Sequence, residues 1–186
     1  PKQAAVGWYR FVLTYAGLKN KLQALRVLVS DFTPAPFRVA TELNGDRFEP
    51  GDKVEVTALA KLHAGGPYAN ADTRVTARLR QARFHSKDPL AKGFRFSSGR
   101  HPNRRNWKLH QLNAEGNDLG EVTIGFELAD QKIVYGRLHV ESAVRDDRGK
   151  YVTAAATADY IGRDRFIGLR NTRWTYDEDQ PAGIEY

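Results

Sequence analysis

Basic side chains crowd one stretch of this chain, between residues 78 and 108. The stretch holds ten lysines and arginines and a single acid, Asp88, so its net charge is +9, whereas the rest of the chain carries −2. Guanidinium and ammonium groups pair with phosphate, sulfate and carboxylate, so the chemistry of such a run is anion binding. The candidate contacts for an anionic partner are Arg83, Lys92, Arg95, Arg100, Arg104 and Arg105.

Aromatic residues are interleaved with these cations, at Phe84, Phe94, Phe96 and Trp107. Such a mixture suits base stacking in a nucleic-acid site. No nucleic-acid-binding motif accompanies it, so we favour a solvated connection whose aromatic side chains dock on their own domain, and we expect no nucleic-acid partner. The alternatives for an anionic partner are an acidic neighbouring domain, anionic lipid head groups or an acidic protein.

The other residue types that carry chemistry form no recognisable site. The five histidines lack metal-ligand spacing, and we interpret them as surface or strand-packing residues, although His110 and His139 both fall on expected strands. The acidic run at 177–179 lacks the spaced oxygen ligands of a calcium loop and is typical of a turn. We therefore predict neither a metal nor a cofactor.

Nucleophilic catalysis is not indicated either. The chain contains no cysteine, which excludes disulfides, thiolate metal sites and cysteine nucleophiles, and it has no serine elbow, phosphate loop or dinucleotide fingerprint. We expect no enzymatic activity. Trp8, Trp107 and Trp174 are far apart in the sequence, and we interpret them as core residues rather than a sugar-stacking platform.

Length and composition set the frame for these residues. The chain has 186 residues, of which 41% are hydrophobic, enough for one large or two small domains with a real core. No apolar run is long enough to span a membrane, and the first residues lack the apolar core of a signal peptide. Methionine is absent, even at position 1, so we expect an excised fragment of a longer protein.

Short runs of alternating apolar and polar residues, separated by turn residues about every 8–12 positions, predict half-buried β-strands and an all-β sandwich class. The first two strands form an expected hairpin, with arms at 8–15 and 22–29. The other runs that predict strands lie at 37–43, 54–60, 73–80, 107–112, 120–128, 136–144 and 150–158. We expect tight turns at 113–116 and 146–149, and a long irregular connection from 81 to about 106.

Several stretches of the chain, taken in order, resemble the macroglobulin domains of bacterial alpha-2-macroglobulins, which are large protease-trapping proteins. The order and spacing of these stretches carry the resemblance over most of the chain. They are 26–32 followed by 36–39, the Pro-Gly-Asp motif and strand at 48–56, the Gly-Gly-Pro turn at 65–71, and the paired turns at 112–116 and 144–150.

The resemblance implies tandem fibronectin-like antiparallel β-sandwiches. Residues 1–30 are then the closing hairpin of a preceding macroglobulin domain. Residues 31–98 and 99–170 are two further macroglobulin-like sandwiches, most naturally the third and fourth of the array. Residues 171–186 begin the following domain.

The implied function is that of non-catalytic scaffold domains in a parent protein that inhibits endopeptidases by trapping them. In the family a protease cuts a bait region, the domains rearrange and a thioester links to the captured enzyme. The thioester needs a cysteine, which this chain lacks, and the family's bait lies several domains later, so we do not interpret the basic connection as bait. The implied partners are neighbouring macroglobulin domains and, through the parent, target proteases. The implied location is the periplasm or cell envelope, with the parent anchored as a lipoprotein.

Two other classes of function fit tandem sandwiches. One is a surface adhesin or carbohydrate-binding module. The other is polyanion binding by the basic stretch.

Overall fold

The computed structural model describes residues 5–14, 22–29, 34–96 and 106–186 and divides the chain into two compact units, Pro1–Ala35 and Pro36–Tyr186. The first unit is an antiparallel hairpin of β1 (Gly7–Leu13) and β2 (Leu22–Val29), with a bulge between Phe11 and Val12. Its aromatic and β-branched residues favour strands. The expected hairpin is confirmed.

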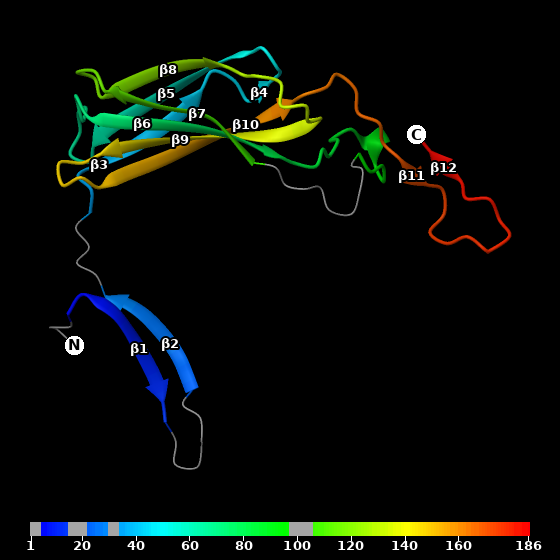
Figure 1. The fold of residues 1–186 in the computed structure, drawn as a ribbon, viewed down its shortest axis with the longest axis horizontal. Coiled ribbons are helices and arrows are strands. Elements are labelled where there is room, and N and C mark those ends of the chain that lie inside the picture. Colours follow the sequence, from blue (N-terminus) through cyan, green and yellow to red (C-terminus); the bar gives the residue numbers. More distant parts are fainter. Residues whose placement is uncertain (1–4, 15–21, 30–33, 97–105) are drawn as a thin grey trace. The chain divides into compact units, whose positions relative to one another are not determined.

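The second unit is a sandwich of two sheets (Figure 1). The smaller sheet has the order β3-β5-β8, made of β3 (Phe37–Leu43), β5 (Lys53–Leu62) and β8 (Glu121–Glu127). The larger sheet has the order β4-β10-β9-β6-β7, made of β4 (Arg47–Phe48), β10 (Tyr151–Ile161), β9 (Tyr135–Arg145), β6 (Asp72–Gln81) and β7 (Asn106–Glu115). Neighbouring strands are antiparallel except β4 and β10, which pair in parallel.

The core lies between the two sheets, because alternate residues of each strand face inward. Along β6 and β9 these inward residues include Leu79 and Leu138, which are fully buried, and they pack with Val54 and Val56 of β5. A smaller cluster forms around Phe37, whose ring stacks on Tyr68 at 4.0 Å between centroids. The all-β sandwich class is therefore confirmed.

The expected boundary between two sandwiches at residues 98 and 99 is wrong. Strand β5 pairs with β8, and β6 pairs with both β7 and β9, so segments from either side of that boundary share the same sheets. Periodicity locates strands but not their partners, since pairing in a sandwich joins segments far apart in the sequence. The segment from 37 to 81 supplies β4 and β6 to the larger sheet. These two strands are not neighbours in that sheet, so the segment cannot form both layers of a sandwich by itself.

One of the two expected turns is confirmed and the other is displaced. The turn at 146–149 joins β9 to β10, and the Asp146 carboxylate accepts hydrogen bonds from the backbone N–H groups of Arg148 and Lys150 at 3.0 and 2.8 Å. The turn expected at 113–116 lies later, because β7 continues to Glu115. The Asn117 side chain caps the actual turn, which ends at Gly120 with φ of +71°, a conformation that favours glycine.

The chain after β6 forms a short 3₁₀ helix, η1 (Pro89–Ala91), and then pairs in a bridge between Arg95 and Leu169. At the C-terminus β11 (Arg170–Asn171) pairs antiparallel with β12 (Ile184–Glu185), and the Arg170 guanidinium forms an ion pair with Glu185. Within the described ranges no helix has the length and apolarity needed to cross a membrane.

Candidate anion-binding site

The outer face of the larger sheet becomes basic where β6 ends and β9 begins. Strand alternation buries Leu79 and leaves Arg78 and Arg80 on the outer face, and it does the same for Arg137 and His139 on either side of Leu138. The register places Arg78 opposite His139 and Arg80 opposite Arg137. Opposite side chains of antiparallel strands have Cβ atoms about 5 Å apart, so these cations lie close together.

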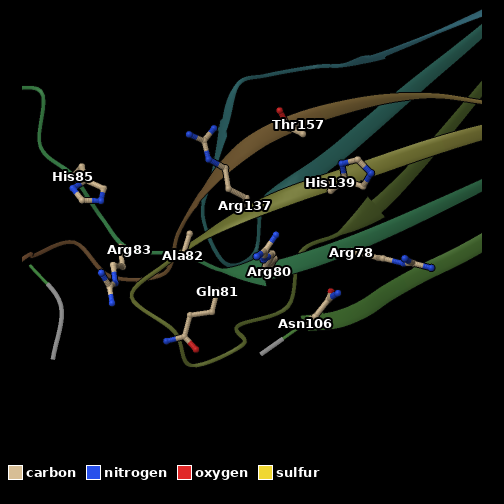
Figure 2. Close-up of a pocket in the computed structure, with 10 residues that line it drawn as sticks. All are labelled: Arg78, Arg80, Gln81, Ala82, Arg83, His85, Asn106, Arg137, His139 and Thr157. Carbon is tan, nitrogen blue, oxygen red and sulfur yellow. The ribbon is translucent and has the colours of Figure 1, made fainter. Parts of the chain in front are cut away.

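These side chains surround an open hollow of about 1070 Å³ (Figure 2). Arg83 and His85, on the segment that leaves β6, extend its wall. The residues that line it are Arg78, Arg80, Gln81, Ala82, Arg83, His85, Asn106, Arg137, His139 and Thr157. Four arginines, two histidines, three neutral polar residues and one alanine line this hollow, and none of these residues is acidic.

One cation of the hollow is neutralised within the sheet. Arg137 lies 2.9 Å from the Asp159 carboxylate of β10, and the Tyr135 hydroxyl donates a hydrogen bond to the same carboxylate, also at 2.9 Å. Burial raises the pKa of Tyr135, and the hydrogen bond and charge of Asp159 add to that effect, so the phenol stays a neutral donor. Asp159 therefore has two partners of its own and offers little charge to the neighbouring arginines.

Arg78 and Arg80 of β6 and Lys108 of β7 differ from Arg137, because none of them has a carboxylate partner among the described residues. In the part of the chain that the structure describes, no carboxylate lies within 4 Å of the charged groups of Arg78, Arg80 or Lys108. Lys108 of β7 stands opposite Arg78, which extends the row of like charges to a third strand. Such a surface attracts anions and holds them by charge-assisted hydrogen bonds.

The described residues contain no group of three or more His, Asp or Glu side chains placed to hold a metal ion. Nor do the two histidines that fall on strands meet. The ring of His110 packs at 4.6 Å from that of Phe126, toward the core, whereas His139 lies on the outer face. The hollow is thus a surface of basic and neutral polar side chains.

Comparison with known proteins places this fold. No family model and no curated protein matches the sequence. Solved structures do match. The native conformation of Escherichia coli alpha-2-macroglobulin aligns with a TM-score of 0.66 and 19% identity over 99% of this chain and 12% of that one. Salmonella alpha-2-macroglobulin reacted with methylamine aligns with a TM-score of 0.68 and 16% identity over 91% of this chain and 11% of that one.

The chain has the fold of a macroglobulin-like domain. A third structure, trypsin-activated E. coli alpha-2-macroglobulin, aligns with a TM-score of 0.59 and 18% identity over 90% of this chain and 11% of that one. At these identities the likeness is one of fold. The chain spans only 11% to 12% of the length of these proteins.

The macroglobulin-like sandwich brings one of the six predicted contact residues, Arg83, to the hollow. Lys92 and Arg95 lie further along the same segment, beside the chain at Leu169 and Arg170, where the Lys92 carbonyl accepts a hydrogen bond from Arg170 at 3.0 Å and Arg95 pairs with Leu169. The remaining three, Arg100, Arg104 and Arg105, lie outside the described residues.

The aromatic side chains of the basic stretch pack within the macroglobulin-like unit. The Phe84 ring stacks on Phe166 at 3.9 Å and meets Phe96 and Tyr135 edge-on at 5.3 and 5.6 Å, while Phe94 lies under the Arg170 guanidinium at 4.6 Å. The interpretation that these aromatics dock on their own domain is confirmed.

The three tryptophans differ in burial, and only one of them is a core residue. Trp107 packs against the core cluster, as expected. The core interpretation is wrong for Trp8 and Trp174, whose side chains are 59% and 93% exposed. Trp8 carries the Arg26 guanidinium over its ring at 4.2 Å. Trp8 is exposed because it lies in a two-stranded hairpin, and Trp174 is exposed because it lies in the loop between β11 and β12.

The sequence analysis did not name nine of the ten lining residues as contacts. Six of the nine fall within the basic stretch, whereas Arg137, His139 and Thr157 lie outside it. The alternation of Arg137-Leu138-His139 does indicate that both polar side chains share one face of a strand. The alternation does not reveal which strand pairs with which. Arg80 and Arg137 stand opposite each other although they are 57 positions apart in the sequence.

Proposed function

We propose that this chain is a non-catalytic scaffold module of a bacterial alpha-2-macroglobulin-like protein that inhibits endopeptidases by trapping them. The observation that carries the proposal is the likeness of strand architecture to the E. coli and Salmonella proteins over 91% to 99% of this chain. A module of this kind contributes rigidity, because a close-packed two-sheet core resists deformation and passes a displacement at one edge to the other. Its partners are adjacent domains of the same polypeptide, and the parent acts in the periplasm or cell envelope.

The first unit supports this modular role. A two-stranded hairpin is marginally stable alone in water. In β1 and β2 several large apolar side chains are half exposed or more, including Trp8, Phe11, Leu13 and Leu25 at 56% to 60%. Such surface is typical of strands that complete a larger sheet. The hairpin therefore serves as the closing pair of a preceding macroglobulin domain, and residues 171–186 serve as the start of a following one.

The test uses the longest polypeptide that carries this chain, mixed with excess over trypsin or elastase. A trapping protein hides the protease from a large protein substrate while a small peptide substrate still reaches it. We expect cleavage of casein to fall and cleavage of a short chromogenic peptide to persist. Equal loss of both activities, or loss of neither, would contradict trapping.

The isolated chain is the control, because it tests whether residues 1–186 inhibit a protease without the rest of the parent protein. We expect a tenfold molar excess of residues 1–186 to leave both protease activities unchanged, because a scaffold module offers no means of capture. Stoichiometric inhibition by the isolated chain would contradict the assignment of this region as scaffold.

A further inference from the structure

We propose that the hollow on the outer face of β6 and β9 binds a ligand that carries several phosphate groups. The inference stands apart from protease trapping, because it rests on side chains of this one face. Its starting observation is the group of basic side chains at the end of the sheet, where Arg78 and Arg80 of β6 stand opposite His139 and Arg137 of β9.

Charge density favours phosphate over carboxylate. Arg78 and Arg80 lie two residues apart on one strand, about 7 Å along it, and each faces a basic side chain on the next strand. Like charges at opposite positions repel. One phosphate monoester carries a charge of about −1.5 to −2 and three strong acceptor oxygens, so it offsets two guanidiniums at once, which a single carboxylate does not.

The neutral residues of the wall fit the same ligand. Asn106, Gln81 and Thr157 add hydrogen-bond donors around the cations, and Ala82 is the one apolar residue of the lining. Among the described residues no Phe, Tyr or Trp side chain lines this hollow, and the nearby Phe84, Phe94 and Phe96 pack within the unit. The site thus offers mainly charged and hydrogen-bonding contacts, which suit oxyanions.

The size of the hollow indicates more than one phosphate. Its volume of about 1070 Å³ exceeds the roughly 300–1000 Å³ of ordinary small-molecule sites. An adjoining hollow of about 680 Å³ shares Arg83, His85 and Arg137, but Asp46 and Asp159 and the rings of Phe84 and Tyr135 also line it. The first hollow, where the cations gather, has room by itself for a chain of phosphates or for a head group that bears several.

The test titrates inorganic polyphosphate of about ten phosphates into the full chain by calorimetry at 150 mM salt. The decisive variant is Arg78→Gln with Arg80→Gln. We expect its affinity to fall about tenfold or more, since each charge-assisted bond lost weakens binding by roughly that factor. Neither arginine has an ion-pair partner among the described residues, so the fold should survive, which a thermal melt checks.

The chain offers a matched control on its other sheet. Arg38 of β3 and Lys61 of β5 are exposed, stand directly opposite each other, and have no carboxylate within 4 Å in the described ranges. The variant Arg38→Gln with Lys61→Gln removes the same net charge. We expect its affinity to stay within about twofold of the parent chain. An equal loss in both variants would overturn the site, because binding would then follow net charge alone.

Two further titrations settle the chemistry and the source of the phosphate. Polyglutamate of matched charge should bind at least about tenfold more weakly, and equal affinity would overturn the assignment to phosphate in favour of an acidic protein segment.

A comparison of vesicles that contain a phosphoinositide with vesicles of phosphatidylcholine separates a lipid source of phosphate from a soluble one. Tighter binding to the former than to free polyphosphate identifies a lipid head group, and binding only to free polyphosphate identifies a soluble ligand. Binding to neither probe would overturn the proposal.

Discussion

The two ends of the larger sheet differ in how their charged side chains are paired. At the end where β9 turns into β10, which we call the turn end, charged groups have partners. Arg145 lies 3.7 Å from Asp72, the buried Asp146 carboxylate binds Arg148 at 2.8 Å, and the Tyr68 hydroxyl donates to Asp147 at 2.8 Å. At the other end, which we call the basic end, Arg78 and Arg80 face other cations.

The contrast runs along a single strand, because β6 begins at Asp72 and ends at Gln81. The named charges at the turn end are paired, whereas at the basic end Arg78 and Arg80 have no carboxylate partner among the described residues, although Arg137 pairs with Asp159. Side chains that repel one another in the folded state and have no structural partner are candidates for ligand binding. Substitutions at either end, or at both, test this contrast, in order of decreasing expected effect.

The largest effect should come from Gly162→Ala, just beyond β10 at the basic end. The glycine N–H donates to the Val134 carbonyl at 2.9 Å, and a Cβ at this position would fall inside van der Waals contact of the Ile133 carbonyl oxygen. We expect a loss of about 3 kcal/mol in the free energy of unfolding, measured by urea denaturation. Gly125→Ala on β8 is the control, since its Cβ would meet nothing within 4 Å. Similar midpoints for the two variants would contradict this close approach.

The second effect is a pH dependence at the turn end. Burial acts to raise the pKa of Asp146, but hydrogen bonds from the Lys150 and Arg148 N–H groups and the Arg148 guanidinium outweigh it, so the pKa is lowered from 3.8. The ionised carboxylate therefore stabilises the fold above that ordinary value, and this contribution is lost as pH falls through the lowered pKa.

Asp146→Asn should accordingly be less stable than the parent chain at pH 7, and the gap should narrow as pH falls below about 4. Urea denaturation across this range measures it. Asp164→Asn, which alters a carboxylate that is 87% exposed, is the comparison variant and should leave the profile unchanged. A gap that stays constant with pH would rule out this role for the carboxylate.

A smaller effect is expected for Tyr68→Phe, also at the turn end. The substitution removes the hydrogen bond to Asp147 and keeps the stack on Phe37, so we expect a loss of about 1 kcal/mol in thermal or urea unfolding. Tyr151→Phe serves as the control, because its ring carries Arg74 at 4.8 Å and the substitution retains that ring. If both variants lose equally, the Tyr68 hydroxyl contributes nothing specific.

The smallest effect tests the comparison directly by exchanging charge at each end. Arg80→Glu places an acid opposite Arg137 and should raise the free energy of unfolding by about 0.5 kcal/mol, whereas Arg145→Glu places an acid beside Asp72 and should lower it by about as much. Both changes should shrink at high salt, since exposed charges are screened. Shifts of the same sign for the two variants would show that the ends do not differ.

Much of the fold was predictable from the residues. Each expected strand appears, including β10, where the three alanines at 154–156 leave a helix open by propensity but Val152 and Thr153 favour a strand. The turn at 146–149 was predictable because Asp and Gly suit it. The turn at 117–120 was not, because Asn113 and Gly116 offer the same signal a few residues earlier and only the length of the pairing with β6 decides between them.

The positive charge of the candidate site was predictable from the sequence, but its position in the fold was not. An excess of positive charge between residues 78 and 108 is plain from the sequence, as is the outward position of Arg78 and Arg80 on an alternating strand. The six residues predicted to contact an anion belong to the irregular stretch, yet the hollow forms over the end of the sheet, and Arg83 is the one predicted residue that lines it. Strands β6, β7, β9 and β10 supply most of the other lining residues.

By itself, then, the sequence determined which segments are strands, which faces of them are apolar and where positive charge gathers, because these follow from local periodicity and composition. Only the tertiary structure decided that one sandwich uses strands from both halves of the second unit, and that Arg80 meets Arg137 across β6 and β9. Sheet pairing is a long-range choice, settled by burying inward faces together, and that choice placed cations from distant segments side by side.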